Sequence, residues 1–271
     1  MLTTERLCDI LREAAKAEIV PRFRRLDEGM VRTKTSAIDL VTEADEGAER
    51  VITAALRAEE SGLMVVGEEA VAANPSLLDA ALGAENVVYV DPVDGTANFA
   101  AGLPLFAVMG AVVRGGETVA GAIYDPMGDD VIVAEKGAGA YQVFPDGRRV
   151  RLKFAAPTDL SQMVGTVSVN YLPPERRSAV LANLARVSAF GAYRCAGHEY
   201  RTAATGWLHF VMYQKLMPWD HLAGALILAE AGAHVARLDG SEYRPHHRDG
   251  GILAAPDAEG WEALRREVFA G

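Results

Sequence analysis

The acidic run VVYVDPVDGTANF at residues 87–99 holds the side chains best suited to chemistry. Its apolar start has the length of a short buried strand, and Asp91 and Asp94 follow at the end of that strand. Gly95 frees the backbone just beyond them, so the turn can hold both carboxylates and its own carbonyl groups around one small volume. Because the run contains no Cys or His, this pattern predicts a site for a hard cation such as Mg²⁺ or Ca²⁺ rather than for zinc.

A helix that begins within residues 95–99 would add a second property to this site. Its free N–H groups would point toward an anion held by the metal. A metal site next to a helix start therefore predicts a bound phosphate. The alternative is an acidic surface turn in which Asn and Gly are present only for backbone reasons.

A site for a divalent cation needs more oxygen ligands than two aspartates supply. Two adjacent glutamates follow a predicted strand at residues 63–66. If that strand is a neighbour of the strand at 87–90, Glu68 and Asp91 lie at the same edge of the sheet. The alternative for Glu68 and Glu69 is a charged turn.

Two more carboxylates stand at predicted helix starts. Asp45 begins a predicted helix at residues 45–60, and Asp220 lies in the first turn of a predicted helix at residues 218–230 that Pro218 opens. Either acid has a structural alternative, which is an N-terminal cap for Asp45 and a helix-dipole partner for Asp220.

The elements that must position these residues change in type near residue 155. A predicted amphipathic helix at 4–20 comes first, and five strand-like segments joined by short turns predict an antiparallel sheet between residues 105 and 154. Beyond a junction at 155–161, strands and helices alternate, which indicates an α/β arrangement with some parallel strands. We therefore predict two domains, an α+β domain at 1–155 and an α/β domain at 156–271.

Composition limits the class of protein. Half of the 271 residues are hydrophobic and 24% are charged, as in a folded globular protein, and no apolar run reaches the length of a membrane span. The net charge of −10 disfavours a nucleic-acid surface. Because no membrane span is found and residues 1–20 are too charged and amphipathic for a signal peptide, we expect a cytoplasmic location. Cys8 and Cys195 are too few for a disulfide framework, so we expect buried thiols.

Four segments in order carry a family resemblance. DPVDGTANF, together with KTSAIDLVTEAD at 34–45, GEE at 67–69 and PWDHLAGALILAEAG at 218–232, resembles the inositol monophosphatase family of metal-dependent phosphatases. The resemblance implies the layered α-β-α-β-α sandwich of the inositol monophosphatase and fructose-1,6-bisphosphatase type. It also implies a Mg²⁺-dependent, Li⁺-sensitive enzyme that forms a homodimer.

The same resemblance assigns the metal ligands. Glu68, Asp91 and the carbonyl group of Val93 would hold one Mg²⁺, and Asp91 would bridge to a second that Asp94 and Asp220 complete. Two or three Mg²⁺ ions per site are implied, and Mn²⁺ or Ca²⁺ can substitute in binding.

Catalytic roles follow from the matching positions. Thr96, hydrogen-bonded to Asp45, would orient and deprotonate the attacking water, and Glu68 is assigned to catalysis with them. The N–H groups of Gly95 and Thr96 would hold phosphate oxygens, and Lys34 would reach over the cleft. Water would attack directly, without a phosphoenzyme.

The chain departs from the family pattern where the substrate's alcohol would bind. The family usually has a GSAA-like segment where this chain reads RCAGHEY, in which Ala196 still matches. Tyr213 stands where inositol-specific members have a Glu. We assign Ala196, Arg194, Tyr213 and Asp220 to substrate binding, and Arg194, His198 and Tyr213 suggest a different or broader leaving group. The alternatives are a surface cation, a helix-capping His and a half-buried strand Tyr.

The expected activity is hydrolysis of inositol 1-phosphate or a related small phosphate ester by a metal-activated water. Alternatives within the resemblance are a 3′-phosphonucleotide, histidinol phosphate or sugar phosphate as substrate, or an added regulatory binding role. A haloacid-dehalogenase-like phosphatase is disfavoured, because its two acids stand two residues apart and Asp91 and Asp94 stand three apart.

Overall fold

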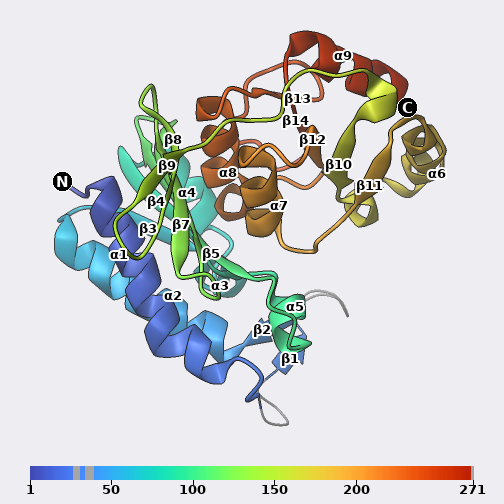
Figure 1. The fold of residues 1–271 in the computed structure, drawn as a ribbon. Coiled ribbons are helices and arrows are strands. Elements are labelled where there is room, and N and C mark those ends of the chain that lie inside the picture. Colours follow the sequence, from blue (N-terminus) through green and yellow to red (C-terminus); the bar gives the residue numbers. More distant parts are fainter. Residues whose placement is uncertain (27–30, 34–39, 270–271) are drawn as a thin grey trace.

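The computed structural model describes residues 1–26, 31–33 and 40–269 (Figure 1). Its centre is a seven-stranded sheet with the strand order β3-β4-β5-β6-β7-β8-β9. β3 and β4 are parallel, and every later pair in this sheet is antiparallel. The strands are β3 Met64–Gly67, β4 Asn86–Asp94, β5 Ala107–Arg114, β6 Glu117–Asp125, β7 Asp130–Glu135, β8 Gly139–Val143 and β9 Arg149–Arg151.

Two helices near the N-terminus cover one face of this sheet. α1 Thr4–Ala14 and α2 Glu43–Glu59 pack there, and Leu11 and Ile52 share a core with Val88 of β4. The chain leaves α1 through a π-helical turn and a 3₁₀ turn at residues 15–22, where Pro21 lacks the N–H group that would continue an α-helix.

Two later helices cover the opposite face. α7 Ala196–Ala204 and α8 Pro218–Glu230 contribute Tyr200 and Leu222 to a core that includes Tyr89 of β4. β4 therefore reads as a continuous apolar run because both of its faces are buried. Close packing depends on missing side chains, since a Cβ on Gly121 would lie 2.8 Å from the Cα of Ala223 in α8.

A five-stranded sheet packs on the other side of α7 and α8 (Figure 1), with the order β11-β10-β12-β14-β13. β10 is parallel to β11 and β12, whereas β14 is antiparallel to β12 and β13. The strands are β10 Val164–Val167, β11 Ala189–Gly191, β12 Phe210–Tyr213, β13 His234–Arg237 and β14 Ile252–Ala255.

The outer face of this second sheet carries α6 Pro174–Asn183 and α9 Ala258–Glu267, which bury Val180 and Leu264 in a third core. The layers therefore run α1 and α2, first sheet, α7 and α8, second sheet, α6 and α9. This is the α-β-α-β-α sandwich that the family resemblance implied.

Smaller elements complete the description. A short antiparallel pair joins β1 to β2, two short helices lie between β3 and β4, and α5 follows β4. These elements are β1 Val31–Thr33, β2 Leu40–Thr42, α3 Glu68–Ala73, α4 Leu77–Leu82 and α5 Thr96–Ala100. α3, α4, β13 and the β1–β2 pair were not predicted from the sequence.

The strands of the two sheets come from separate parts of the chain, with the last strand of the first sheet ending at Arg151 and the second sheet beginning at Val164. α7 and α8 nevertheless belong to the second part and pack on the first sheet, so the division at residue 155 stays a prediction. Cys8 and Cys195 are buried free thiols, as expected. Among the described residues, no helix has the length and apolar character to cross a membrane.

Candidate active site

Parallel pairing of β3 with β4 brings the first two acids together. The register places Gly67 opposite Val90, so Glu68, which follows β3, lies beside Asp91 of β4. Glu68 is the first residue of α3, and Asp91 is buried. The sequence prediction that these two carboxylates share one edge of the sheet is therefore correct.

A bulge in β4 places the next acid. Asp91 pairs with Met109 and Asp94 pairs with Ala107, so three steps along β4 match two along β5. In a regular strand, two residues three apart face opposite sides, and the extra residue changes this alternation. Asp91 and Asp94 consequently line the same cavity. The N–H group of Val93 donates to Oδ1 of Asp91 at 3.0 Å, which stabilises the bulge.

The third acid of the cluster comes from α8. Glu68, Asp91 and Asp220 each have a carboxylate oxygen within 4.8 Å of the others, and the described residues contain no second group of this kind. Burial, and then the charge of the neighbouring carboxylates, holds the pKa of Asp91 well above its ordinary value. The same causes raise the pKa of Asp220 to about 8, against the positive charge of Lys215. Three carboxylates this close favour divalent cations bound through oxygen.

Asp94 stands apart from this group of three. Its Oδ2 accepts the N–H group of Gly197 at 2.5 Å and the thiol of Cys195 at 3.0 Å. Both groups belong to the start of α7, so Asp94 joins the first sheet to that helix. Both bonds use the same oxygen, and Asp94 still lines the cavity with the other acids.

Thr96 lies between Asp45 and the bulge. Its hydroxyl oxygen is 3.0 Å from Oδ1 of Asp45 and 2.9 Å from the carbonyl oxygen of Val93. Asp45 is buried in the first turn of α2, where Oδ2 accepts the N–H group of Thr42 at 2.9 Å. Burial raises the pKa of Asp45 to about 6, although the hydrogen bonds from Thr42 and Thr96 act in the opposite direction. Asp45 therefore completes a helix cap and also contacts Thr96.

Gly95 is required at its position for two reasons. Its φ of 85° is left-handed, and an added Cβ would lie 2.9 Å from the carbonyl oxygen of Leu105 and 3.0 Å from Cβ of Cys195. α5 then begins at Thr96, within the predicted range, and Gly95, Thr96 and Ala97 line the cavity with the acids.

A cavity of about 260 Å³ is lined by Glu68, Asp91, Asp94, Thr96 and Asp220, and a smaller cavity of about 120 Å³ shares part of its lining. Asp94, Asp220, Tyr171 and Lys215 line both cavities. The wall from the second part of the chain supplies Arg194, Lys215 and Tyr171, and the wall from the first sheet supplies most of the acids.

The predicted substrate residues are only partly brought together. Ala196 begins α7 and lines the smaller cavity with Tyr213, while Arg194 is exposed and lines the larger one. His198 lines neither cavity, and its Nε2 lies 3.2 Å from the carbonyl oxygen of Phe106, the residue before β5. The prediction for Lys34 lies outside the described residues.

Sequence reasoning missed two residues of the smaller cavity. Glu199 is buried, and its carboxylate accepts the hydroxyl of Tyr213 and the N–H group of Tyr193, each at 2.7 Å. Burial raises the pKa of Glu199 to about 7. Lys215 follows β12 and lines both cavities. The available signals were the position of Glu199 within the already divergent RCAGHEY segment and a lone cation five residues before Asp220.

Glu49 is a third missed residue, and it acts on Glu68 through the backbone. Its carboxylate accepts the N–H groups of Glu69 at 2.7 Å and Ala70 at 2.8 Å, which lie in the first turn of α3. An added Cβ on Gly67 would lie 2.2 Å from the carboxyl carbon of Glu49. The absence of a side chain at Gly67 thus lets a buried acid on α2 hold the helix start that carries Glu68.

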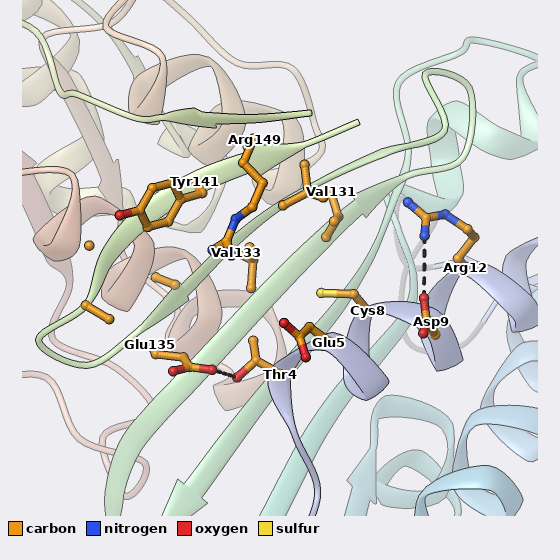
Figure 2. Close-up of a pocket in the computed structure, with 14 residues that line it drawn as sticks. Thr4, Glu5, Cys8, Asp9, Arg12, Val131, Val133, Glu135, Tyr141 and Arg149 are labelled. Carbon is orange, nitrogen blue, oxygen red and sulfur yellow. Dashed lines mark hydrogen bonds and ion pairs between the residues drawn. The ribbon is translucent and has the colours of Figure 1, made fainter. Parts of the chain in front are cut away.

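A larger cavity of about 320 Å³ lies elsewhere, between α1 and the strands β7, β8 and β9 (Figure 2). Its charged lining residues are partly paired with one another, as Arg12 is with Asp9 at 3.6 Å. Thr4 also donates a hydrogen bond to Glu135 across its floor. No group of three metal-ligating side chains converges here among the residues that the structure describes, so we place the candidate site at Asp91.

The comparisons with known proteins agree over nearly the whole chain. The model of the inositol monophosphatase family matches residues 4–268. An inositol-1-monophosphatase of Mesorhizobium japonicum is 33% identical over 208 residues, which cover 75% of this chain and 74% of the relative. A protein of Thermotoga maritima described as fructose-1,6-bisphosphatase/inositol-1-monophosphatase is 30% identical over 219 residues, which cover 78% of this chain and 77% of that relative.

A solved structure gives the same result for the fold. The crystal structure of the extragenic suppressor protein suhB from Bartonella henselae has a TM-score of 0.84 and 27% identity to this chain. The similarity covers 98% of each chain.

Proposed function

The chain belongs to the inositol monophosphatase family, and from that premise we propose that it is a Mg²⁺-dependent phosphomonoesterase whose site is the cavity at Asp91. The observation that carries the proposal is the convergence of Glu68, Asp91 and Asp220 from three elements, next to the hydrogen-bonded pair of Thr96 and Asp45. We propose inositol 1-phosphate or a related small phosphate ester as the substrate.

The donor set fits magnesium because every candidate ligand is an oxygen. Glu68, Asp91 and the carbonyl group of Val93 would hold one ion, and Asp91, Asp94 and Asp220 would hold a second. A third ion per site stays a prediction. The carbonyl oxygen of Val93 has two lone pairs, so its contact with Thr96 leaves one for a cation. When bound, Mg²⁺ supplies charge neutralisation for the phosphate and a lowered pKa for water.

The residues of this chain would orient and deprotonate the attacking water. The hydroxyl of Thr96 has one proton, which it donates toward Asp45 or the carbonyl of Val93, and its oxygen is left to accept a proton from water. Asp45 is suited to receive the proton that Thr96 passes on, since its pKa of about 6 lies near neutral pH. Glu68 would help to position the water. Water would attack phosphorus directly.

The phosphate would lie against the start of α5. The N–H groups of Gly95 and Thr96 are proposed to hold its oxygens, and a role for Lys34 above them stays a prediction. The leaving group would extend toward Ala196, Asp220, Arg194 and Tyr213. The homodimer, the cytoplasmic location and the sensitivity to Li⁺ also remain proposals, as does the expectation that neither a membrane nor a nucleic acid is a partner.

Phosphate release tests the proposal directly. With Mg²⁺ we expect turnover of at least one ester among inositol 1-phosphate, glycerol phosphates, histidinol phosphate, sugar phosphates and adenosine 3′,5′-bisphosphate, with loss of turnover in a chelator and inhibition by Li⁺. Asp91→Asn should lower kcat by at least about 100-fold, because Asp91 would bridge both ions.

Asp79→Asn provides the matched control, since Asp79 is an exposed carboxylate paired with Arg248 away from the cavity. This variant should keep normal turnover, and circular dichroism should show that both variants are folded. Normal turnover in Asp91→Asn, or phosphate release that is indifferent to a chelator, would rule out the proposed site.

A further inference from the structure

We propose that Arg201 is a positioning residue, which together with Asp125 and Asp130 fixes α7 on the first sheet and thereby sets the orientation of Asp94. This inference rests on the proposed phosphatase function, in which Asp94 completes the second metal site. Arg201, Asp125 and Asp130 line neither cavity of the site, so they would act on the metal through α7.

The start of α7 decides how the carboxylate of Asp94 is turned. Oδ2 of Asp94 accepts the N–H group of Gly197 at 2.5 Å and the thiol of Cys195 at 3.0 Å. Because both donors hold the same oxygen, they also direct the other oxygen, Oδ1, which is left for a cation. A displacement of α7 on the sheet would therefore turn Asp94 relative to the other acids.

α7 approaches the first sheet closely along the face that carries Gly197 and Arg201. These residues stand four apart, so they share one face of the helix. An added Cβ on Gly197 would lie 2.7 Å from Cβ of Ala107 and 3.1 Å from Cγ2 of Ile123. Nη1 of Arg201 donates to the carbonyl oxygen of Ile123 at 3.2 Å. Both positions of α7 thus meet the same residue of β6, and a single helical turn connects Arg201 to the groups that hold Asp94.

A pair of like charges on the sheet is compensated by Arg201. Asp125 of β6 and Asp130 of β7 stand directly opposite each other in the antiparallel pair, where two like charges destabilise a sheet. The guanidinium group of Arg201 forms an ion pair with Asp130 and lies 3.8 Å from Oδ2 of Asp125. Arg201 and Asp130 are buried, and an added Cβ on Gly128 would lie 2.8 Å from Oδ2 of Asp130. The turn between β6 and β7 is therefore built to present two acids to α7.

His198 adds a second polar contact between α7 and the sheet. Its Nε2 lies 3.2 Å from the carbonyl oxygen of Phe106 and 3.9 Å from Oδ1 of Asp125. His198 belongs to the RCAGHEY segment, in which the chain departs from the family pattern, and Arg201 follows directly after it. The polar residues of this region thus attach α7 to the first sheet.

Stability alone does not explain a buried ion pair in this place. Well-packed apolar residues of similar size often stabilise a fold equally or better, because buried ions lose their hydration. α7 already contributes Tyr200, Ala203 and Ala204 to the core that it shares with the first sheet. A planar guanidinium group donates in fixed directions, so it defines the position of a helix more narrowly than an apolar contact does. That position is the property on which the orientation of Asp94 depends.

Binding of Mn²⁺ to the full chain, measured by titration calorimetry, tests this inference without turnover. Asp94→Asn first identifies the binding step that depends on Asp94. Arg201→Met should lower the affinity of the same step by about fivefold or more and leave any other step within about twofold. The Mg²⁺ concentration for half-maximal phosphate release should rise in parallel.

A double variant separates position from stability. In Arg201→Met, the buried Asp130 keeps the hydrogen bond from Gln142 at 3.0 Å but loses its ionic partner, so the chain should unfold at a lower urea concentration. Addition of Asp130→Leu removes the uncompensated charge, so stability should recover while the Mn²⁺ affinity stays low.

Arg114→Met is the matched control. Arg114 forms a partly buried ion pair with Glu60 at 3.2 Å, and it ends β5 at the opposite end from the residue that pairs with Asp94. This variant should also lose stability, but it should keep the native Mn²⁺ affinity.

The outcomes separate the two proposals. Native Mn²⁺ affinity in Arg201→Met, equal weakening in Arg114→Met, or recovery of the affinity with Asp130→Leu would each overturn the positioning inference and leave the phosphatase proposal standing. The inference also fails if Asp94→Asn weakens no step or a different one, since Arg201 would then not act through Asp94. A native chain that binds no Mn²⁺ refutes the proposed metal site and this inference with it.

Discussion

Among single residues, Glu199 shows how burial changes the chemistry of a side chain. It stands on α7 inside the core, and its carboxylate is held by Tyr213 and by the backbone of Tyr193. Burial raises its pKa from an ordinary value of 4.5 to about 7. Near neutral pH this residue is therefore partly protonated in the folded protein, while it is ionised in the unfolded chain.

This difference predicts a pH dependence of stability. Below pH 4.5 both states are protonated, so the full contribution of Glu199 is present there, and it is lost as the pH rises through about 7. The loss amounts to at most about 3 kcal/mol. Glu199→Gln removes this pH dependence. The free energy of unfolding of the variant, minus that of the native protein, should therefore rise between pH 4.5 and pH 7.5. Urea unfolding in the presence of a chelator measures both values.

Glutamine also changes the hydrogen bonds to Tyr213 and Tyr193, which shifts the free energy of unfolding by a similar amount at every pH. Only the change of the difference with pH therefore reports the titration of Glu199. Glu59→Gln, at an exposed position that pairs with Arg6, should show no such trend. A constant difference between Glu199→Gln and the native protein across this range would mean that Glu199 titrates normally in the fold.

Among elements, α3 shows how a short helix is made to hold a ligand. It has six residues and no side-chain cap at Gly67, and α2 supplies the missing acceptor through Glu49. The carboxylate of Glu49 accepts two N–H groups of the first turn, and its negative charge suits the positive end of the helix. Glu68 is thereby held in place although it is the first residue of a helix of only six residues.

Glu49→Gln should therefore weaken metal binding without stopping the reaction. An amide oxygen can accept one of the two N–H groups, while the NH₂ group opposes the other, so the position of Glu68 becomes less well defined. We expect the Mg²⁺ concentration for half-maximal phosphate release to rise about tenfold or more, with kcat at saturating Mg²⁺ changed by much less.

The control for this prediction is again Glu59→Gln, on the same helix but exposed at its far end. Gly67→Ala provides a second approach to the same contact, because the added Cβ would collide with the carboxylate of Glu49. An unchanged Mg²⁺ requirement in both variants would show that α3 holds Glu68 without help from α2.

At the scale of the whole molecule, α8 connects the layers to the chemistry. It packs on the first sheet and on the second, and its first turn carries Asp220 to the acids of β4 and α3. Close contact of α8 with α7 requires Gly224, since a Cβ there would lie 2.2 Å from the ring of Tyr200. A cation bound between Asp220 and Asp91 would therefore join layers that come from distant parts of the chain.

Magnesium should consequently stabilise the fold. At 100 times its dissociation constant, a ligand that binds only the folded state adds about 2.7 kcal/mol, which corresponds to a rise in Tm of roughly 5–10 °C for a chain of this size. Asp220→Asn should remove most of this rise. Without metal, the variant should melt at or above the native Tm at pH 8, because one like charge is gone from the cluster.

Asp79→Asn should respond to Mg²⁺ as the native protein does, since Asp79 lies exposed on α4. Calorimetry with and without a chelator measures all three proteins under one set of conditions. An equal rise in Tm for the native protein and for Asp220→Asn would place the stabilising cation elsewhere.

The sequence by itself determined the acidic run, the types and order of most elements and the helix that carries Asp220. These follow from local rules, since strand length, apolar periodicity and turn residues act over a few neighbouring positions. The family motifs also lie within short segments. The resemblance that these motifs carry implied the layered architecture and the roles proposed for Asp91, Asp94 and Thr96 before any contact was known.

Only the tertiary structure decided which distant groups meet. Glu49 caps a helix twenty residues away, Glu199 meets Tyr213, and Lys215 lies between the two cavities, none of which any local pattern records. The short helices α3 and α4 were missed because tertiary contacts, and not periodicity, stabilise elements of six residues. Burial, and with it the altered pKa values of Asp91, Asp220 and Glu199, depends on how the layers pack together, because that packing alone removes water from these carboxylates.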